Sequence, residues 1–190
     1  QSETVIGWQI DNELNCEMAW FRSQSDHEAF RLHLQQKFGS LDALNEAIGG
    51  AFWNQSYSDW SEVYLASPTV SNSPNPHLLL EEIRFVSESA IAFCQMQADI
   101  IKKHAREGQF ITTNGIFPHL DSHKMTEKSL DFISYDNYPN FCFAPGDAGI
   151  NEAGASDLLD RGVGLNLSRA RAISPNFCIM EQQSGPQGWN

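Results

Sequence analysis

The sequence carries little positive charge. It contains 12 lysine and arginine residues against 24 aspartate and glutamate residues, so its formal net charge is −12. A surface of this kind repels the phosphate groups of nucleic acids and of anionic membranes. We therefore expect neither as a partner, whereas neutral and cationic ligands are compatible with the composition.

Long apolar runs and clustered cysteines are also missing. No stretch approaches the roughly 20 consecutive apolar residues that a transmembrane helix needs. Residues 1–4 lack the basic segment of a secretory signal, and the apolar run after them is short. The four cysteines follow neither CxxC nor zinc-binding spacing: Cys16, Cys94, Cys142 and Cys178. We therefore expect free thiols in a reducing compartment and a cytoplasmic protein.

The chain of 190 residues is long enough for one domain with a sizeable core, and its apolar residues alternate between two periods. Short apolar runs predict strands over Val5–Ile10, Phe110–Thr113, Asp131–Tyr135 and Phe177–Met180. Helical spacing predicts helices over 29–38, 41–48, 76–108 and 156–173. In the longest helix one stripe is expected to be the packing face, and it consists of Leu79, Ile83, Val86, Ala90, Phe93, Gln97 and Ile101.

Strands that alternate with helices predict an α/β fold with parallel strands, because each crossover contains a helix. Both a (β/α)8 barrel and a doubly wound sheet place their ligands at the carboxyl ends of such strands. No glycine-rich phosphate loop follows any of the predicted strands. This absence counts against a nucleotide-binding version of the fold.

Every predicted strand runs into polar residues at its carboxyl end. Asn12 and Glu13 follow the first strand, Asn114 the second, "DNYP" the third, and Glu181 the last. Two carboxylates at one barrel rim are what glycoside hydrolysis needs, one as proton donor and the other as nucleophile. A separation of about 5–5.5 Å would give retention of configuration through a covalent intermediate.

Other residues near these glutamates suit sugar binding. The Asn12 amide can hydrogen-bond a sugar 2-hydroxyl, a contact that strengthens toward the transition state. Aromatic rings suit stacking on the apolar faces of sugars, and the candidates are Trp53, Trp60, Tyr138 and Trp189.

The sequence resembles the family 42 β-galactosidases, which belong to a clan of retaining glycosidases built on (β/α)8 barrels. The segments that carry the resemblance run in the family's order over essentially the whole chain. They are "GWQIDNEL", "FWNQSYSDW", "NPHLLLEEIRF", "ITTNG", "LDFISYDNYP" and "IMEQQSGPQGWN". The pairing of "WQIDNE" with "MEQQSGP" is the most specific of these features.

The resemblance implies roles for individual residues. Glu13 is expected to be the acid/base after the fourth barrel strand, and Glu181 the nucleophile at the end of the seventh. Asn12 matches the 2-hydroxyl contact, and Trp53 and Trp189 match walls of the sugar subsite. The substrate-binding set is completed by Asn114 and Gln182, as subsite or supporting groups, and by Tyr138 beside the nucleophile, with Tyr135 as the alternative.

The chain departs from the family in two respects. Many members bind zinc through a cysteine cluster after the acid/base, but here that segment contains Cys16 alone, so we expect no metal and no cofactor. The stretch "HLDSH", with His119, Asp121 and His123, is interpreted as a solvated loop. The alignment also begins at the fourth strand and ends after the seventh, so we expect residues 1–190 to be a single partial barrel domain of a longer enzyme.

A partial barrel of four βα units would have two open sheet edges, so we expect the isolated chain to be weakly active or inactive. For the complete protein, the resemblance implies a small neutral β-galactoside or oligosaccharide as substrate and a homo-oligomer such as a trimer. Another glycosidase of the clan, acting on β-glucosides, β-mannosides or arabinosides, would share the two carboxylates. A non-catalytic carbohydrate-binding barrel would need neither glutamate.

Overall fold

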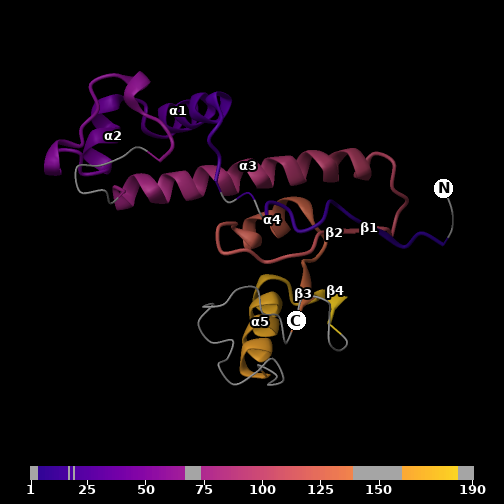
Figure 1. The fold of residues 1–190 in the computed structure, drawn as a ribbon. Coiled ribbons are helices and arrows are strands. Elements are labelled where there is room, and N and C mark those ends of the chain that lie inside the picture. The colour runs from indigo at the N-terminus through magenta and orange to yellow at the C-terminus, as the bar shows by residue number, and fades with distance from the viewer. Residues whose placement is uncertain (1–3, 17, 19, 67–73, 139–159, 184–190) are drawn as a thin grey trace. The chain divides into compact units, whose positions relative to one another are not determined.

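A computed structural model describes residues 4–16, 18, 20–66, 74–138 and 160–183, with the backbone alone for 160–162 (Figure 1). Its strands are β1 (Gly7–Gln9), β2 (Phe110–Thr112), β3 (Ser134–Asn137) and β4 (Cys178–Gln182). Its helices are α1 (Gln24–Phe38), α2 (Leu41–Ala47), α3 (Pro76–Lys102), α4 (Ser122–Ser129) and α5 (Asp160–Ile173), with short 3-10 helices η1 (Phe52–Asn54) and η2 (Trp60–Glu62). This order confirms the predicted alternation of strands and helices.

The chain divides into two compact units. The first, here called the strand unit, comprises residues 1–14, 93–117 and 122–190, and the second, the helical unit, comprises 15–92 and 118–121. The two units are described separately below. None of the helices in the described ranges is long and apolar enough to cross a membrane.

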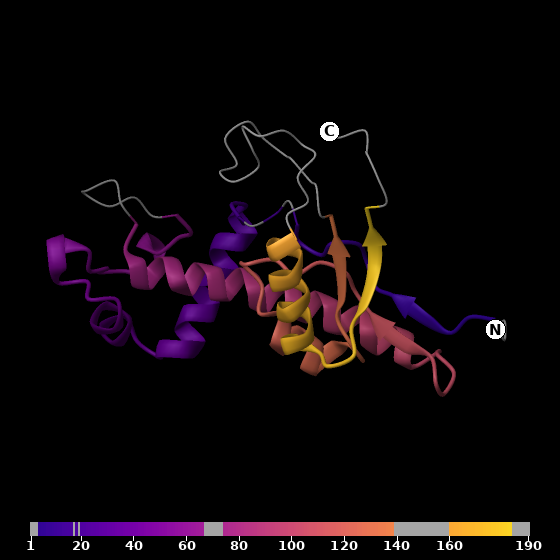
Figure 2. The same cartoon turned by 90° about the horizontal axis from the view of Figure 1, so that it is seen from below.

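Parallel pairing organises the strand unit. β1 pairs with β2, with Gly7 opposite Phe110, and β3 pairs with β4, with Ser134 opposite Cys178. The two pairs are connected by a hydrogen bond of 2.9 Å from the Ser134 backbone N–H to the Thr113 carbonyl. Figure 2 shows β3 (orange) and β4 (yellow) side by side with α5 alongside, and α5 contacts β3. This arrangement confirms the predicted α/β architecture with parallel strands.

Several predicted boundaries differ from those of the structure. The third strand begins at Ser134 rather than Asp131, because Asp131 lies in a bend before the strand, where its carboxylate accepts the Ile111 backbone N–H at 2.7 Å. The loop expected around "HLDSH" is present at His119 and Asp121, but helix α4 begins at Ser122 and includes His123. The long helix α3 ends at Lys102, and Gly108 lies in the turn before β2 with a φ of 85°.

The helical unit is built around the first two helices. Ser23 caps α1 in a capping box, in which its side chain accepts the Asp26 backbone N–H and Asp26 accepts the Ser23 N–H. Ser40 caps α2 in a similar way by accepting the Ala43 N–H. Apolar side chains from both helices and from the residues up to Phe85 form one core: Phe30, Leu34, Leu44, Ile48, Val63, Leu65, Leu78 and Phe85.

The predicted packing face of α3 was partly wrong. Val86 and Ala90 of the predicted stripe are buried, whereas Ile83 and Phe93 are 37% and 47% exposed. In the helical unit the buried side of α3 instead includes Glu81, which is 5% exposed and bound by Lys37 at 2.6 Å and Arg84 at 2.5 Å. The two cations offset the cost of burying this carboxylate. Glu81 is therefore buried, although the apolar periodicity of the helix predicts that it lies on the exposed face.

Candidate active site

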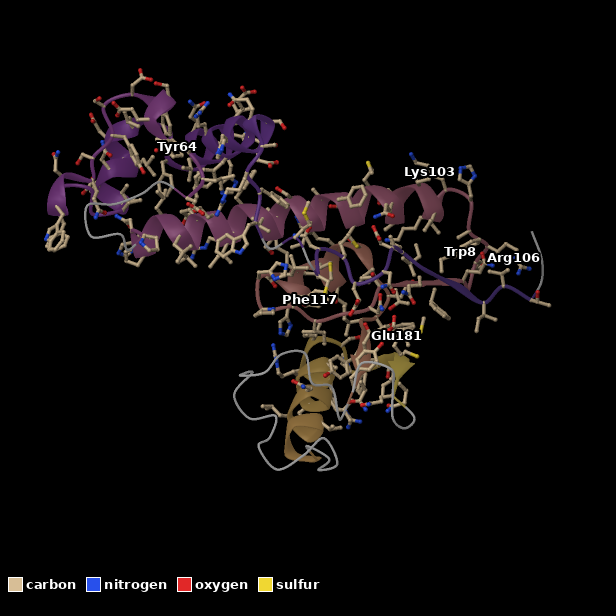
Figure 3. The ribbon with its side chains drawn as sticks, in the orientation of Figure 1. Trp8, Tyr64, Lys103, Arg106, Phe117 and Glu181 are labelled. Atoms are coloured by element: carbon tan, nitrogen blue, oxygen red, sulfur yellow. The ribbon has the colours of Figure 1, made fainter. Side chains whose placement is uncertain are left out.

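The polar residues that follow the four strands converge in the strand unit. Glu13 follows β1, Asn114 follows β2, Asp136 lies in β3 and Glu181 in β4. The Asn114 side chain lies within hydrogen-bond distance of groups from all three of the other segments. These contacts bring the carboxyl ends of the strands together in a common polar site. Figure 3 shows Glu181 at this site, well apart from the labelled Trp8 and Arg106.

Asn114 joins the two glutamates. Its Oδ1 accepts the Glu13 backbone N–H at 2.9 Å, and its Nδ2 donates to Glu181 Oε1 at 3.0 Å. Nδ2 also lies 2.9 Å from Asp136 Oδ2 and 3.1 Å from Asn12 Oδ1, so three acceptors compete for two N–H groups. The side chain is 1% exposed. Asn114 therefore binds the backbone of Glu13 and the side chain of Glu181.

The backbone at Glu13 has an uncommon conformation. Its φ of 44° is in the left-handed region, which costs a non-glycine residue about 1–2 kcal/mol. The neighbouring strand end is close by, because a Cβ on Gly115 would lie 3.6 Å from the Glu13 Cα and 2.6 Å from the Phe117 ring. Gly115 itself has a φ of 91°. The bond to Asn114 and this close packing hold the Glu13 backbone in place.

A register shift between β3 and β4 turns Glu181 toward the site. Tyr135 is opposite Ile179, but the next residue, Asp136, is opposite Glu181, so Met180 is skipped. Successive residues of a strand point to opposite faces. In unbroken register Asp136 would be opposite Met180, and Glu181 would share the other face with Ile179. The bulge therefore brings the carboxylates of Asp136 and Glu181 to the same side of the sheet.

Tyr138, rather than Tyr135, contacts Glu181. The Tyr138 hydroxyl donates a hydrogen bond to Glu181 Oε2, and this bond, with burial, raises the pKa of Tyr138. Tyr135 points the other way: its hydroxyl bonds Asn166 of α5, and burial raises its pKa. The choice that the sequence left open is thus made by the alternation of side chains along β3 and the residues after it.

Asp136 was not assigned a role from the sequence. It is 7% exposed, and burial together with the charges of Glu181 and Glu13 raises its pKa to about 6. Its Oδ1 atom is buried and accepts no hydrogen bond from the part of the chain that the structure describes. The sequence signal was the polar run "DNYP", but nothing in that run separates Asp136 from an ordinary loop residue.

Comparisons with known proteins identify the family. The family model of glycoside hydrolase family 42, described as beta-galactosidase, matches residues 1–190. The chain belongs to this family. It is 39% identical over 206 residues to a β-galactosidase of Thermus thermophilus and 35% identical over 195 residues to one of Halorubrum lacusprofundi. These alignments cover 98% and 99% of this chain but only 30% and 27% of the two relatives.

Solved structures of family members have the same fold over this length. The β-galactosidase of Halorubrum lacusprofundi superposes with a TM-score of 0.87 at 34% identity, covering 99% of this chain and 28% of that one. The enzyme of Marinomonas ef1 gives a TM-score of 0.85 at 31% identity, covering 98% and 29%. The fold is therefore a portion of the (β/α)8 barrel, as predicted, and the chain spans less than a third of these relatives.

The polar residues expected to bind substrate in this family lie near the glutamates. Asn12 is exposed, and its Oδ1 accepts from Asn114 at 3.1 Å and from Gln9 at 3.4 Å. Gln182 is also exposed, and its Oε1 accepts from Asn137 at 2.9 Å. Gln9, which sequence reasoning missed, donates to Asn114 Oδ1 at 2.9 Å. It carried no signal, because it lies inside the predicted strand.

The aromatic candidates lie partly inside and partly outside the described residues. Trp53 belongs to the helical unit, where it is 54% exposed and its ring stacks on Phe52 at 5.5 Å. Trp60 packs against the core of that unit. Trp189 lies outside the described residues. The roles of Trp53 and Trp189 as sugar-subsite walls stay predictions.

Within the described ranges, no group of three or more His, Cys, Asp and Glu side chains is arranged to hold a metal ion. Cys94 and Cys178 are free thiols, and Cys142 lies outside the described residues. The absence of a zinc site in this member of the family stays a prediction, which chelation of the encoded protein can test.

Proposed function

We propose that the encoded protein that contains this chain is a retaining β-galactosidase and that this chain supplies both of its catalytic carboxylates. The observation that carries the proposal is the shared hydrogen bonding of Glu13 and Glu181 to Asn114, which connects two residues far apart in sequence. Membership of family 42 supports the substrate class. A family member from G. stearothermophilus, 29% identical over the aligned part, is described as a catalytic mutant in which glutamate is replaced by alanine.

The first half of the proposed reaction forms a covalent intermediate. An oxygen of the Glu181 carboxylate attacks the anomeric carbon of a terminal β-galactoside, and the bond from that carbon to the glycosidic oxygen breaks. Glu13 gives its proton to the departing oxygen. Hydrogen bonds from Asn114 and Tyr138 orient the attacking carboxylate. The products of this step are the free aglycone alcohol and a galactosyl ester of Glu181.

In the second half, water hydrolyses the ester. Glu13, now ionised, accepts a proton from water, the water oxygen bonds to the anomeric carbon, and the Glu181 carboxylate leaves. Two inversions give β-galactose. For the first half to occur near neutral pH, Glu13 must retain its proton, and the negative charge of Glu181 favours this.

The remaining residues have supporting roles in the proposal. Asn12 donates through Nδ2 to the sugar 2-hydroxyl, while its Oδ1 is held by Asn114. Asn114 is too buried to touch substrate, so we assign it a positioning role. Gln182 and the two tryptophans Trp53 and Trp189 remain candidates for contacts with the galactose or the aglycone.

Glutamine in place of Glu13 tests the acid/base assignment. In the encoded protein, Glu13→Gln should lower activity far more for aryl β-galactosides with poor leaving groups than for those with good ones. A good leaving group departs without a proton, so the acid contributes little to that reaction. Equal losses for both classes of substrate would contradict the assignment.

Glycine in place of Glu181 tests the nucleophile. Azide added to the Glu181→Gly variant should occupy the vacated space, attack the anomeric carbon from the same side, and yield the α-galactosyl azide. A variant that shows no rescue and no α-configured product would place the nucleophile elsewhere.

A panel of nitrophenyl glycosides distinguishes the galactosidase from a β-glucosidase, a β-mannosidase or an arabinosidase. The oligomer and the cytoplasmic location stay predictions.

A further inference from the structure

The reaction above gives no role to Asp136, a carboxylate in β3 that lies against the nucleophile. Asp136 is 7% exposed, and the register of the two strands places it directly opposite Glu181 of β4. Its Oδ2 lies 2.9 Å from Asn114 Nδ2, and the same nitrogen lies 3.0 Å from Glu181 Oε1. One amide nitrogen therefore bridges the carboxylates of Asp136 and Glu181.

The Asn114 amide is held at both of its ends. Its Oδ1 accepts the Glu13 backbone N–H at 2.9 Å. Its Nδ2 carries two N–H groups, which three acceptors surround: Asp136 Oδ2, Glu181 Oε1 and, at 3.1 Å, Asn12 Oδ1. Because the amide group is planar, the direction of one N–H sets the direction of the other. The acceptor that takes the first N–H therefore decides where the second one points.

Asp136 is a stronger competitor than Asn12 for the first N–H. Burial and the charge of Glu181 raise the pKa of Asp136 to about 6, so it is ionised at slightly alkaline pH. A hydrogen bond to a carboxylate is stronger than one to a neutral amide oxygen. Asn12 is also exposed to solvent, whereas Asp136 is buried and its Oδ1 has no hydrogen-bond partner in the part of the chain that the structure describes.

We propose that Asp136 is a positioning residue that acts through Asn114: by accepting one N–H of the amide, it directs the other N–H to Oε1 of Glu181. That bond orients the attacking carboxylate, whose second oxygen accepts from the Tyr138 hydroxyl. Without Asp136, the amide nitrogen turns toward Asn12 and away from Glu181. The inference rests on the proposed function, because Glu181 must be the nucleophile for its orientation to affect the reaction.

The test is a double-mutant cycle in the encoded protein, built from Asp136→Ala and Asn114→Ala and assayed with a nitrophenyl β-galactoside at slightly alkaline pH. Alone, Asp136→Ala should lower kcat/KM about 30-fold, mainly through kcat, the size of one lost hydrogen bond to a charged group. In the Asn114→Ala background the same substitution should cost less than about threefold, since no amide is left to direct. Asp136→Asn, which keeps an acceptor oxygen, should stay within about fivefold of the wild type.

Ser134→Ala is the matched control for a purely structural loss. Ser134 lies two residues earlier in β3, is 0% exposed, and its hydroxyl pairs with Thr112 Oγ1 at 2.7 Å rather than with Asn114. Its removal should lower the Tm and leave kcat/KM nearly unchanged. If Asp136→Ala does not fold, Asp136→Ser takes its place in the cycle.

Losses that multiply in the double variant would overturn the inference, as would a folded Asp136→Ala variant with wild-type kcat/KM. The loss in Asp136→Ala should also be equal for aryl β-galactosides with good and poor leaving groups. A larger loss for poor leaving groups would assign the effect to the proton of Glu13 and would likewise overturn the inference. Failure of azide to rescue Glu181→Gly would instead refute the proposed function.

Discussion

Replacing Asn114 by alanine removes the group that holds the two glutamates together. The Glu13 backbone N–H loses its acceptor at 2.9 Å, and Glu181 Oε1 loses a donor at 3.0 Å. A neutral hydrogen bond contributes about 1 kcal/mol and one to a charged group about 2 kcal/mol. We therefore expect a loss of about 3 kcal/mol in transition-state stabilisation, or roughly 150-fold in kcat/KM. The Asn114 side chain is 1% exposed and does not touch substrate, so its loss should affect substrate binding little. We therefore expect kcat to fall by a larger factor than KM rises.

The assay is steady-state hydrolysis of a nitrophenyl β-galactoside by the encoded protein, with the fold checked by circular dichroism. Asn137→Ala is the matched control, because Asn137 is 6% exposed at the end of the next strand and donates to Gln182 instead of to a glutamate. It should cost less than tenfold. A folded Asn114→Ala variant whose kcat/KM lies within tenfold of the wild type would refute the idea that this amide positions the pair.

Three further predictions concern the site and the chain. Asn12→Ala should lower kcat/KM on β-galactosides roughly 100-fold but have little effect on 2-deoxygalactosides, and equal losses would contradict the 2-hydroxyl contact. Gly115→Ala should lower the Tm of the encoded protein, because φ is 91° and the new Cβ would meet Phe117, whereas Gly164→Ala in α5, which has open space, should not. The polypeptide of residues 1–190 alone should self-associate on gel filtration and show little turnover, because β1 pairs on one side only among the described strands, and Ile6 before it and Trp8 within it are 72% and 37% exposed. An active monomer of that length would refute the last prediction.

Several features of the fold are encoded locally and could be read from the sequence. The switch between apolar runs and helical spacing predicted the order of the elements, because period-two and period-3.6 patterns leave different spacings along the chain. Helix α4 escaped this reasoning because "SHKMTEKS" contains one large apolar residue, Met125, and so has no stripe. The third strand was placed too early because Asp131 pairs with Ile111 from the adjoining loop.

The residues of the candidate site also fall into those that the sequence predicted and those that it did not. Glu13 and Glu181 were predicted from the sequence because polar residues that end predicted parallel strands must share one edge of the sheet. The same reasoning reached Asn114 but assigned it to the sugar subsite or a supporting role, since burial is invisible in the sequence. Asp136 was passed over because its neighbours in the chain are also polar.

The sequence by itself determined which residues stand at the ends of the strands. Only the tertiary structure decided how they meet: the skipped Met180 turns Glu181 toward Asp136, and the left-handed backbone at Glu13 is held by Asn114. A register shift depends on pairing between strands far apart in the chain. Likewise, a strained backbone conformation depends on a distant side chain that stabilises it. Neither leaves a periodic signal in the sequence, because both are properties of contacts between segments.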